Sequence, residues 1–82
     1  MTEVTLLTKP GCHLCDVARE VIDLTIADLP NADEIDVTET SILDDEALYE
    51  KWWEKIPVVM IDGELHSHWR VSRDRLAEAL SK

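Results

Sequence analysis

The strongest constraint on the fold is a change of hydrophobic period near the N-terminus, on either side of a Lys-Pro-Gly sequence. Before it, Glu3–Thr8 (EVTLLT) is short and contains β-branched residues, which predicts a strand. After it, apolar residues recur at helical spacing from Cys12 until near Ala27, and Pro30 then favours a helix end. The positions expected to face the core are Leu14, Val17, Val21 and Leu24, with Ala18 and Ile22 widening the stripe. A strand that leads into such a helix predicts a right-handed crossover to a parallel second strand.

A second strand and a second helix are expected next. Asp33–Val37 (DEIDV) alternates polar and apolar residues and predicts the second strand. Thr40 or Ser41 is expected to cap the second helix, which Pro57 ends. The core-facing positions of this helix are expected to be Leu43, Ala47, Leu48 and Trp52.

The C-terminal part of the chain predicts a hairpin followed by a last helix. Pro57–Ile61 (PVVMI) is apolar enough for a strand that is buried on both faces. Asp62-Gly63 is a strong turn signal, so Glu64–His68 (ELHSH) is expected as an antiparallel edge strand. Ser72 is a good N-cap for a helix that carries Leu76, Ala77 and Leu80 on its apolar face.

The predicted order is βαβ, then α, then ββα. It indicates a single α/β domain over residues 1–82, with a mixed four-stranded sheet flanked by three helices, on both faces. In open sheets of this kind, functional sites lie where the carboxyl ends of strands meet helix N-termini. The loop after the first strand is therefore the expected site, and it contains both cysteines of the chain.

Composition narrows the classes of protein to consider. The chain has 82 residues with 18 acidic and 8 basic side chains, a net charge of −10. Nucleic-acid binding needs a positive surface, so it is not expected, and anionic membranes would repel the chain. There is no apolar run of about 20 residues and no basic N-terminal region of a secretory signal. We expect a soluble, cytoplasmic protein that is a monomer.

The two cysteines, Cys12 and Cys15, form a Cys-x-x-Cys pair at the predicted start of the first helix. Unpaired N–H groups and the helix dipole point toward the Cys12 sulfur and favour its thiolate. Lys9 and His13 add positive charge nearby, although His13 is expected to be solvated. Cys15 lies one turn later on the same face, where its thiol can attack a mixed disulfide formed by Cys12. The spacing therefore predicts a redox-active dithiol.

Two other interpretations of the cysteine pair stay open. A zinc site usually has four ligands, and His13, His66 and His68 are the only residues available to complete one. His66 and His68 alternate on the predicted edge strand, so both would face the same side. The second alternative is a noncatalytic interaction domain in which the cysteines are inert.

The motif KPGCHLC after a first strand, the later KIPVVMIDGE and the closing helix resemble the glutaredoxin and thioredoxin family. More narrowly, the chain is similar to the small glutaredoxin-like proteins of bacteria. The resemblance implies a thioredoxin fold and a thiol–disulfide oxidoreductase that reduces protein or glutathione mixed disulfides without a metal or organic cofactor. Glutathione is the implied cosubstrate, and the electron donor is either glutathione or a flavin-dependent disulfide reductase.

The resemblance also implies substrate-binding residues. Pro57 is expected to be cis and close to Cys12, with the backbone of Ile56 pairing with bound peptide or glutathione. Lys9 matches the family lysine that pairs with a glutathione carboxylate. The family's Gly-Gly-Cys-Asp stretch is replaced here by SHWRVSRDR, so we expect Arg70 or Arg73 to supply the other carboxylate contact.

Most tryptophans are expected to fill the core of so small a domain. Trp52 fits the apolar stripe of the second helix, and Trp53 is one step round from it, so Trp53 is expected to be partly exposed or to pack beside the Pro57 loop. Trp69 lies in the loop before the last helix, where the alternative to a core position is a place near the dithiol.

Overall fold

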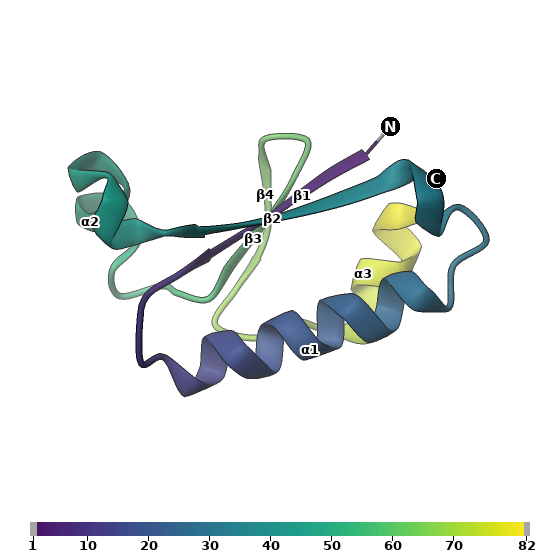
Figure 1. The fold of residues 1–82 in the computed structure, drawn as a ribbon, viewed down its shortest axis with the longest axis horizontal. Helices are drawn as coiled ribbons and strands as arrows, with labels where there is room; N and C mark the ends of the chain where they lie inside the picture. Colours follow the sequence, from purple (N-terminus) through teal and green to yellow (C-terminus); the bar gives the residue numbers. More distant parts are fainter. Residues whose placement is uncertain (1, 82) are drawn as a thin grey trace.

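The computed structural model describes residues 2–81, which form a four-stranded sheet with three α-helices (Figure 1). The elements in chain order are β1 (Thr2–Thr8), α1 (His13–Ala27), β2 (Ile35–Ser41), α2 (Glu46–Trp52), β3 (Val58–Ile61), β4 (Glu64–His68) and α3 (Arg73–Leu80). The strand order is β2-β1-β3-β4. In Figure 1, α1 and α3 lie on one side of the sheet and α2 lies apart from them, beyond the end of β2. The predicted α/β architecture is confirmed.

Strand β1 lies at the centre of the sheet and fixes the register of its neighbours. It pairs in parallel with β2 along its whole length, from Thr2 opposite Ile35 to Thr8 opposite Ser41. It pairs with β3 in the antiparallel direction, and β3 pairs with β4 in the same way. The β3–β4 turn has two left-handed residues, Asp62 (φ 52°) and Gly63 (φ 84°), as a type I′ hairpin turn requires. The predicted hairpin is confirmed.

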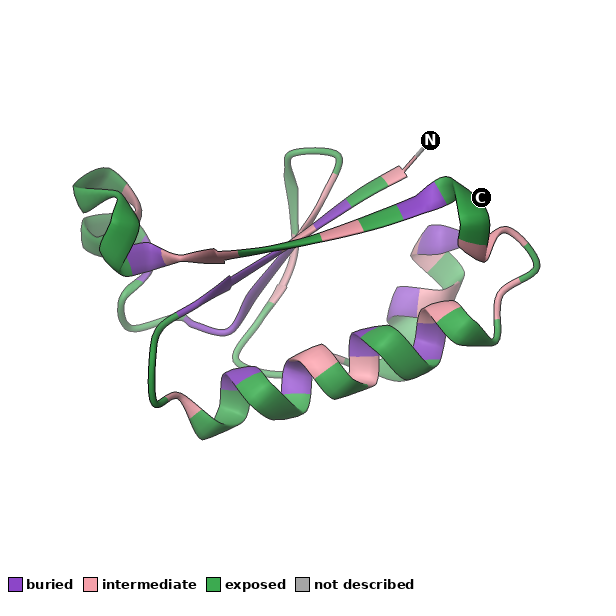
Figure 2. Cartoon of the chain, in the orientation of Figure 1, coloured by how far each residue is buried: buried purple, intermediate pink, exposed green. Residues whose placement is uncertain are grey.

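Alternate residues of the central strands enter two separate cores. Figure 2 marks the buried residues of the strands and helices in purple. Leu6 and its cross-strand partner Val59 face α1 and α3, whereas Leu7 and its partner Val58 face α2. The α1–α3 core consists of Val4, Leu6, Ala18, Ile22, Ile35, Val59, Leu76 and Leu80. The α2 core consists of Leu7, Cys15, Ile42, Trp52, Ile56 and Val58. The strand alternation thus gives each face of the sheet its own hydrophobic cluster.

The face of α1 that packs on the sheet differs from the predicted one. The buried residues are Cys15, Ala18, Ile22 and Thr25. Leu14, Val17 and Leu24, which were expected in the core, are exposed. Two apolar stripes run side by side along this helix, and helical periodicity does not distinguish them. The stripe with the small Ala18 faces the sheet, and this leaves the larger residues on the surface.

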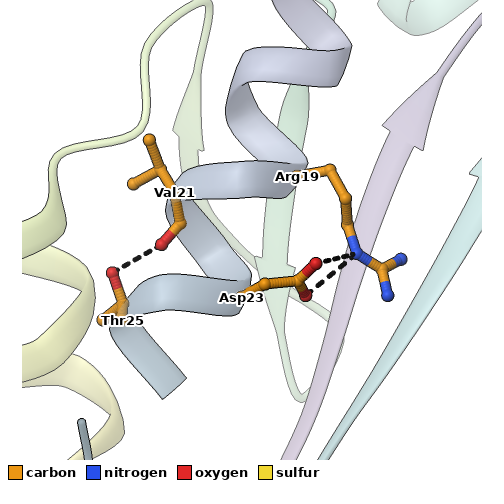
Figure 3. Close-up of polar contacts among 4 residues, drawn as sticks. All are labelled: Arg19, Val21, Asp23 and Thr25. Atoms are coloured by element: carbon orange, nitrogen blue, oxygen red, sulfur yellow. Dashed lines mark hydrogen bonds and ion pairs between the residues drawn. The ribbon is translucent and has the colours of Figure 1, made fainter. Parts of the chain in front are cut away.

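Thr25 is polar, yet it is almost fully buried on this face. Its hydroxyl donates a hydrogen bond of 2.7 Å to the carbonyl of Val21, so the buried oxygen keeps a partner (Figure 3). On another side of the same helix, Arg19 and Asp23 form an exposed i,i+4 ion pair with an N–O distance of 3.0 Å (Figure 3). Such a pair stabilises the helix only slightly.

The segment around the second helix also differs from the prediction. Strand β2 starts at Ile35 and continues to Ser41, because the threonine-containing sequence after Val37 completes the seven-residue ladder with β1. Asp33 and Glu34 lie in a short 3₁₀ turn instead. Ser41 caps a second 3₁₀ turn, Ile42–Asp44, so neither it nor Thr40 caps α2. A capped 3₁₀ turn therefore lies between β2 and α2, and α2 has an N-cap of its own.

The N-cap of α2 is Asp45, whose carboxylate accepts the N–H of Ala47 at 2.9 Å. The predicted core positions Leu43 and Ala47 are exposed, whereas Trp52 is buried as expected. Ser72 caps α3, which confirms that prediction. Within residues 2–81, no helix is long and apolar enough to span a bilayer.

Candidate redox site

A tight turn leads from β1 into α1. The N–H of Cys12 donates to the carbonyl of Lys9 at 3.3 Å, with Pro10 and Gly11 at the two central positions of the turn. Gly11 has φ 79°, which matches the left-handed third position of a type II turn, and proline suits the position before it. No atom outside the adjoining residues lies within 4 Å of a Cβ built on Gly11, so the backbone conformation is what requires glycine. The Lys-Pro-Gly sequence therefore sets where the helix begins.

Cys12 is the N-cap of α1 and is half-buried. Its backbone is extended, and its Sγ accepts a hydrogen bond from the N–H of Cys15 at 3.3 Å. This places the sulfur where serine or aspartate oxygen lies in ordinary N-caps, beside the unpaired N–H groups of the first turn. A negative charge on Cys12 would be stabilised there by a hydrogen bond and by the helix dipole.

Cys15 lies directly behind, with 2% of its surface exposed. Burial, and next the hydrogen bond with the Cys12 side chain, raise the pKa of the Cys15 thiol to about 12. Both cysteines are free thiols in this structure. The pair therefore consists of one accessible sulfur and one enclosed sulfur that stays protonated at neutral pH.

This difference predicts selective alkylation. At neutral pH, iodoacetamide is expected to modify Cys12 in the folded, reduced protein and to leave Cys15 unmodified, because alkylation needs an accessible thiolate. Mass spectrometry of the labelled peptides measures the two sites separately. The denatured protein, in which both residues should react, is the control. Equal labelling of the two cysteines in the folded protein would contradict this assignment.

The loop before β3 packs on the enclosed cysteine. The Ile56–Pro57 peptide bond is cis, as the family resemblance implies. Ile56 is in the α2 core together with Cys15, and Cys12 packs against the same cluster. Among residues 2–81, the N–H and the carbonyl of Ile56 have no hydrogen-bond partner in the turns and loops. This backbone is therefore free to pair with an added strand.

Trp69 ties this loop to the end of β4. Its N–H donates to the carbonyls of Pro57 (2.9 Å) and Lys55 (3.2 Å), and its indole N–H donates to the carbonyl of Glu54 (2.6 Å). The residue has φ 65°, a left-handed conformation that costs a non-glycine residue of the order of 1 kcal/mol or more. The three donor contacts offset this cost and hold the loop in place.

An apolar groove of about 280 Å³ lies between α1 and the β4–α3 connection. It is lined by Leu14, Val17, Ala18, Val21, Trp69, Arg70 and Val71. Trp69 is 56% exposed, so the core position expected for it is wrong, whereas Trp53 is exposed as its place beside the apolar stripe predicts. The groove was not predicted, because the residues of α1 that line it were expected in the core. The sequence signal for the groove was the number of large apolar side chains on α1, which is greater than its buried face can hold.

Two further residues that were predicted near the dithiol are Lys9 and His13. Lys9 is exposed and lines a second, polar hollow of about 260 Å³ beside Cys15, together with Asp16 and Glu39. His13 is the first residue of α1 and is exposed. Lys9 therefore precedes the two cysteines, and His13 lies between them.

The two candidate arginines are separated by the structure. Arg70 lines the apolar groove that includes Leu14, one of the two residues between the cysteines in the motif. Arg73 instead forms an ion pair with Asp28, the C-cap residue of α1, at the opposite end of that helix from Cys12. The structure thus brings Arg70, but not the guanidinium of Arg73, toward the dithiol end of α1.

The histidines are not arranged as the zinc interpretation expected. The β3–β4 ladder shifts register between Val59 and Met60, which leaves His66 as an extra residue on β4. Such a bulge interrupts the regular alternation, so His66 and His68 do not follow the simple two-residue pattern. Over residues 2–81, no three histidine, cysteine or carboxylate side chains are grouped where they could hold a metal ion.

Comparison with known proteins agrees with this geometry. A sequence-family model described as the glutaredoxin-like domain (DUF836) matches residues 3–81. The chain belongs to the glutaredoxin-like family. An uncharacterized protein of Mycobacterium tuberculosis is 31% identical to this glutaredoxin-like chain over 81 residues, covering 98% of this chain and 84% of that protein. A glutaredoxin-like protein of Dictyostelium discoideum is 30% identical over 78 residues, covering 89% of this chain and 69% of the relative.

Solved structures show the same fold. A structural-genomics target protein from X. campestris superimposes on this glutaredoxin-like chain with a TM-score of 0.73 at 26% identity, covering 94% of this chain and 93% of the other. A mutant thioredoxin from Halobacterium salinarum gives a TM-score of 0.65 at 14% identity, covering 95% and 70% of the two chains. The thioredoxin fold implied by the sequence is thereby confirmed.

Proposed function

We propose that this glutaredoxin-like protein is a thiol–disulfide oxidoreductase that reduces protein or glutathione mixed disulfides, with Cys12 as the nucleophile and Cys15 as the resolving thiol. The observation that carries the proposal is the asymmetric pair at the start of α1. The Cys12 sulfur is half-buried and accepts the N–H of Cys15, while Cys15 is enclosed and holds its proton. Cys12 is thus available for the first attack, and Cys15 remains a protonated thiol until the second.

The reaction balances with two electrons from the dithiol. The Cys12 thiolate attacks one sulfur of the substrate disulfide, forms a mixed disulfide and releases the other substrate sulfur as a thiolate, which takes up a proton. Cys15 then loses its proton and attacks the Cys12 sulfur. This forms the Cys12–Cys15 disulfide and releases the second substrate thiol.

The second step becomes easier once the first has occurred. The charge of Cys12 and its hydrogen bond are two of the causes that raise the pKa of Cys15. The Cys12 sulfur carries no charge in a mixed disulfide, so the pKa of Cys15 falls at the stage where its thiolate is needed. The order of the two attacks therefore follows from the arrangement of the two sulfurs.

The substrate-binding surface is proposed from the groups around Cys12. The unpaired backbone of Ile56, beside the cis peptide to Pro57, can bind an extended segment as an added strand. The apolar groove accepts a hydrophobic side chain of that segment, and Lys9 and Arg70 offer positive charge to a carboxylate. Glutathione fits this pattern as cosubstrate, with a flavin-dependent disulfide reductase as the alternative electron donor. A free dithiol of this kind suits a reducing compartment such as the cytoplasm.

A redox titration tests the proposal. The protein is equilibrated in glutathione buffers of graded ratio, quenched with acid, and analysed for Cys12 and Cys15 by thiol labelling and mass. We expect a reversible two-electron transition between the dithiol and an intramolecular disulfide. If the pair never oxidises, the protein is an inert interaction domain. If it can be labelled only after a chelator is added, the cysteines hold a metal and the redox proposal is wrong.

A further inference from the structure

A third hollow, of about 450 Å³, lies between β4 and the start of α3, away from the cysteines. Its lining includes His66 and Ser67 from β4, Arg70 from the connection, and Ser72 and Arg75 from the start of α3. This volume is in the range of small-ligand sites in proteins. The oxidoreductase mechanism uses none of these residues except Arg70.

The hollow contains two arginines without a carboxylate partner. Arg70 and Arg75 form no ion pair within residues 2–81, although the chain has 18 acidic side chains. The other two arginines, Arg19 and Arg73, are each paired with an aspartate. The two arginines that have no ion pair thus line the same hollow.

Further groups in the hollow can donate hydrogen bonds. The Ser67 hydroxyl oxygen is buried and has no partner within the described part of the chain. Buried polar atoms are normally paired, so this unpaired hydroxyl is an exception beside the hollow. Ser72 caps α3, and its hydroxyl accepts the N–H of Arg75 at 3.4 Å, so the first turn of the helix begins at this hollow. The unpaired N–H groups of that turn favour an anion nearby.

His66 responds to the same charge. It is the extra residue of the β4 bulge and lies in the lining of the hollow beside Arg75. Burial, followed by the positive charge of Arg75, lowers the pKa of His66. The imidazole is therefore neutral at physiological pH, and its ring reports the electrostatic potential in the hollow.

We propose that this hollow binds the phosphate group of a small phosphorylated ligand, held by Arg75, Arg70 and the first turn of α3. A phosphate group offers three acceptor oxygens and nearly two negative charges, which suits several donors that converge from different elements. A carboxylate has two oxygens and one charge and would leave more of these donors unpaired. Arg70 also lines the apolar groove, so the bound ligand would lie next to the substrate surface.

The test is a titration of the full chain with inorganic phosphate at constant ionic strength, followed by NMR of the His66 ring and the backbone amides. We expect saturable shifts confined to His66, Ser67 and the start of α3, with a rise in the pKa of His66 because an anion stabilises its charged form. Arg75→Gln should weaken binding by about tenfold or more, the loss expected for one charge-assisted hydrogen bond. Arg19→Gln, which removes a paired surface arginine on α1, is the matched control and should leave binding unchanged.

Two further arms separate the possible outcomes. The double variant Cys12→Ser, Cys15→Ser should bind phosphate as the wild type does. The phosphate site is thereby tested independently of the redox chemistry. Acetate at the same ionic strength should bind at least about tenfold more weakly than phosphate. Equal binding of acetate would make this a carboxylate site and overturn the proposal. Shifts that do not saturate, that appear equally with chloride or that survive Arg75→Gln would also overturn it.

Discussion

Replacing Cys12 with serine is expected to lower the rate of reduction of a glutathionylated peptide by about 10³-fold or more. A hydroxyl at this position keeps the N-cap hydrogen bond, but it is not deprotonated near neutral pH and does not attack sulfur. Cys15→Ser should instead keep the first attack and stop at the mixed disulfide. Mass spectrometry should then find Cys12 joined to the peptide or to glutathione.

Cys12→Ser and Cys15→Ser serve as controls for each other's effect on stability. Each exchanges one sulfur for oxygen on the first turn of α1, so the thermal unfolding of both should be compared before the rates are interpreted. A Cys12→Ser protein that retains activity within about tenfold of the wild type, an effect of about 1.4 kcal/mol, would show that this cysteine is not the nucleophile.

Replacing Ile22 with alanine is expected to destabilise the protein by about 3 kcal/mol. Ile22 is 0% exposed and lies at the centre of the α1–α3 core. The loss combines the transfer free energy of the removed methyl and methylene groups with the cavity they leave. Since a domain of this size has a total stability of about 5–10 kcal/mol, urea unfolding should show a large shift of the midpoint.

Leu24→Ala is the matched control for Ile22→Ala. It removes a side chain of similar size from the same helix, at a position that is 53% exposed. We expect its free energy of unfolding to change by less than about 1 kcal/mol. If Leu24→Ala destabilised the protein as much as Ile22→Ala, α1 would pack on the sheet through the stripe predicted from the sequence, and the observed face would be wrong.

The order of the elements was predictable because it depends on local signals. The turn formed by Lys-Pro-Gly, the Asp62-Gly63 hairpin and the Ser72 cap each encode a backbone conformation in two or three adjacent residues. The placement of Cys12 at the start of α1 follows from the first of these signals. The location of the dithiol is therefore encoded in the residues that immediately precede it.

Features that depend on distant contacts were not predictable. Two apolar stripes on α1 satisfy the same periodicity, and only packing against the sheet decides between them. Arg73 forms an ion pair with Asp28, a residue 45 positions earlier in the chain, and therefore lies away from the dithiol. Trp69 is held by carbonyls of residues 54–57, which lie in another loop. Local patterns contain no information about such partners.

The division of the interior into two clusters places the proposed redox couple in only one of them. Cys15 belongs to the smaller α2 core, whereas α1 and α3 meet the sheet through the other cluster. By a thermodynamic cycle, a side chain shifts the midpoint potential only if it packs differently on the dithiol and on the disulfide. Neighbours of Cys15 such as Trp52 and Ile56 can do so, at about 30 mV for each 1.4 kcal/mol. If the proposed redox chemistry holds, substitutions in the α1–α3 core can therefore change thermal stability with little effect on the midpoint potential, whereas substitutions beside Cys15 can change both.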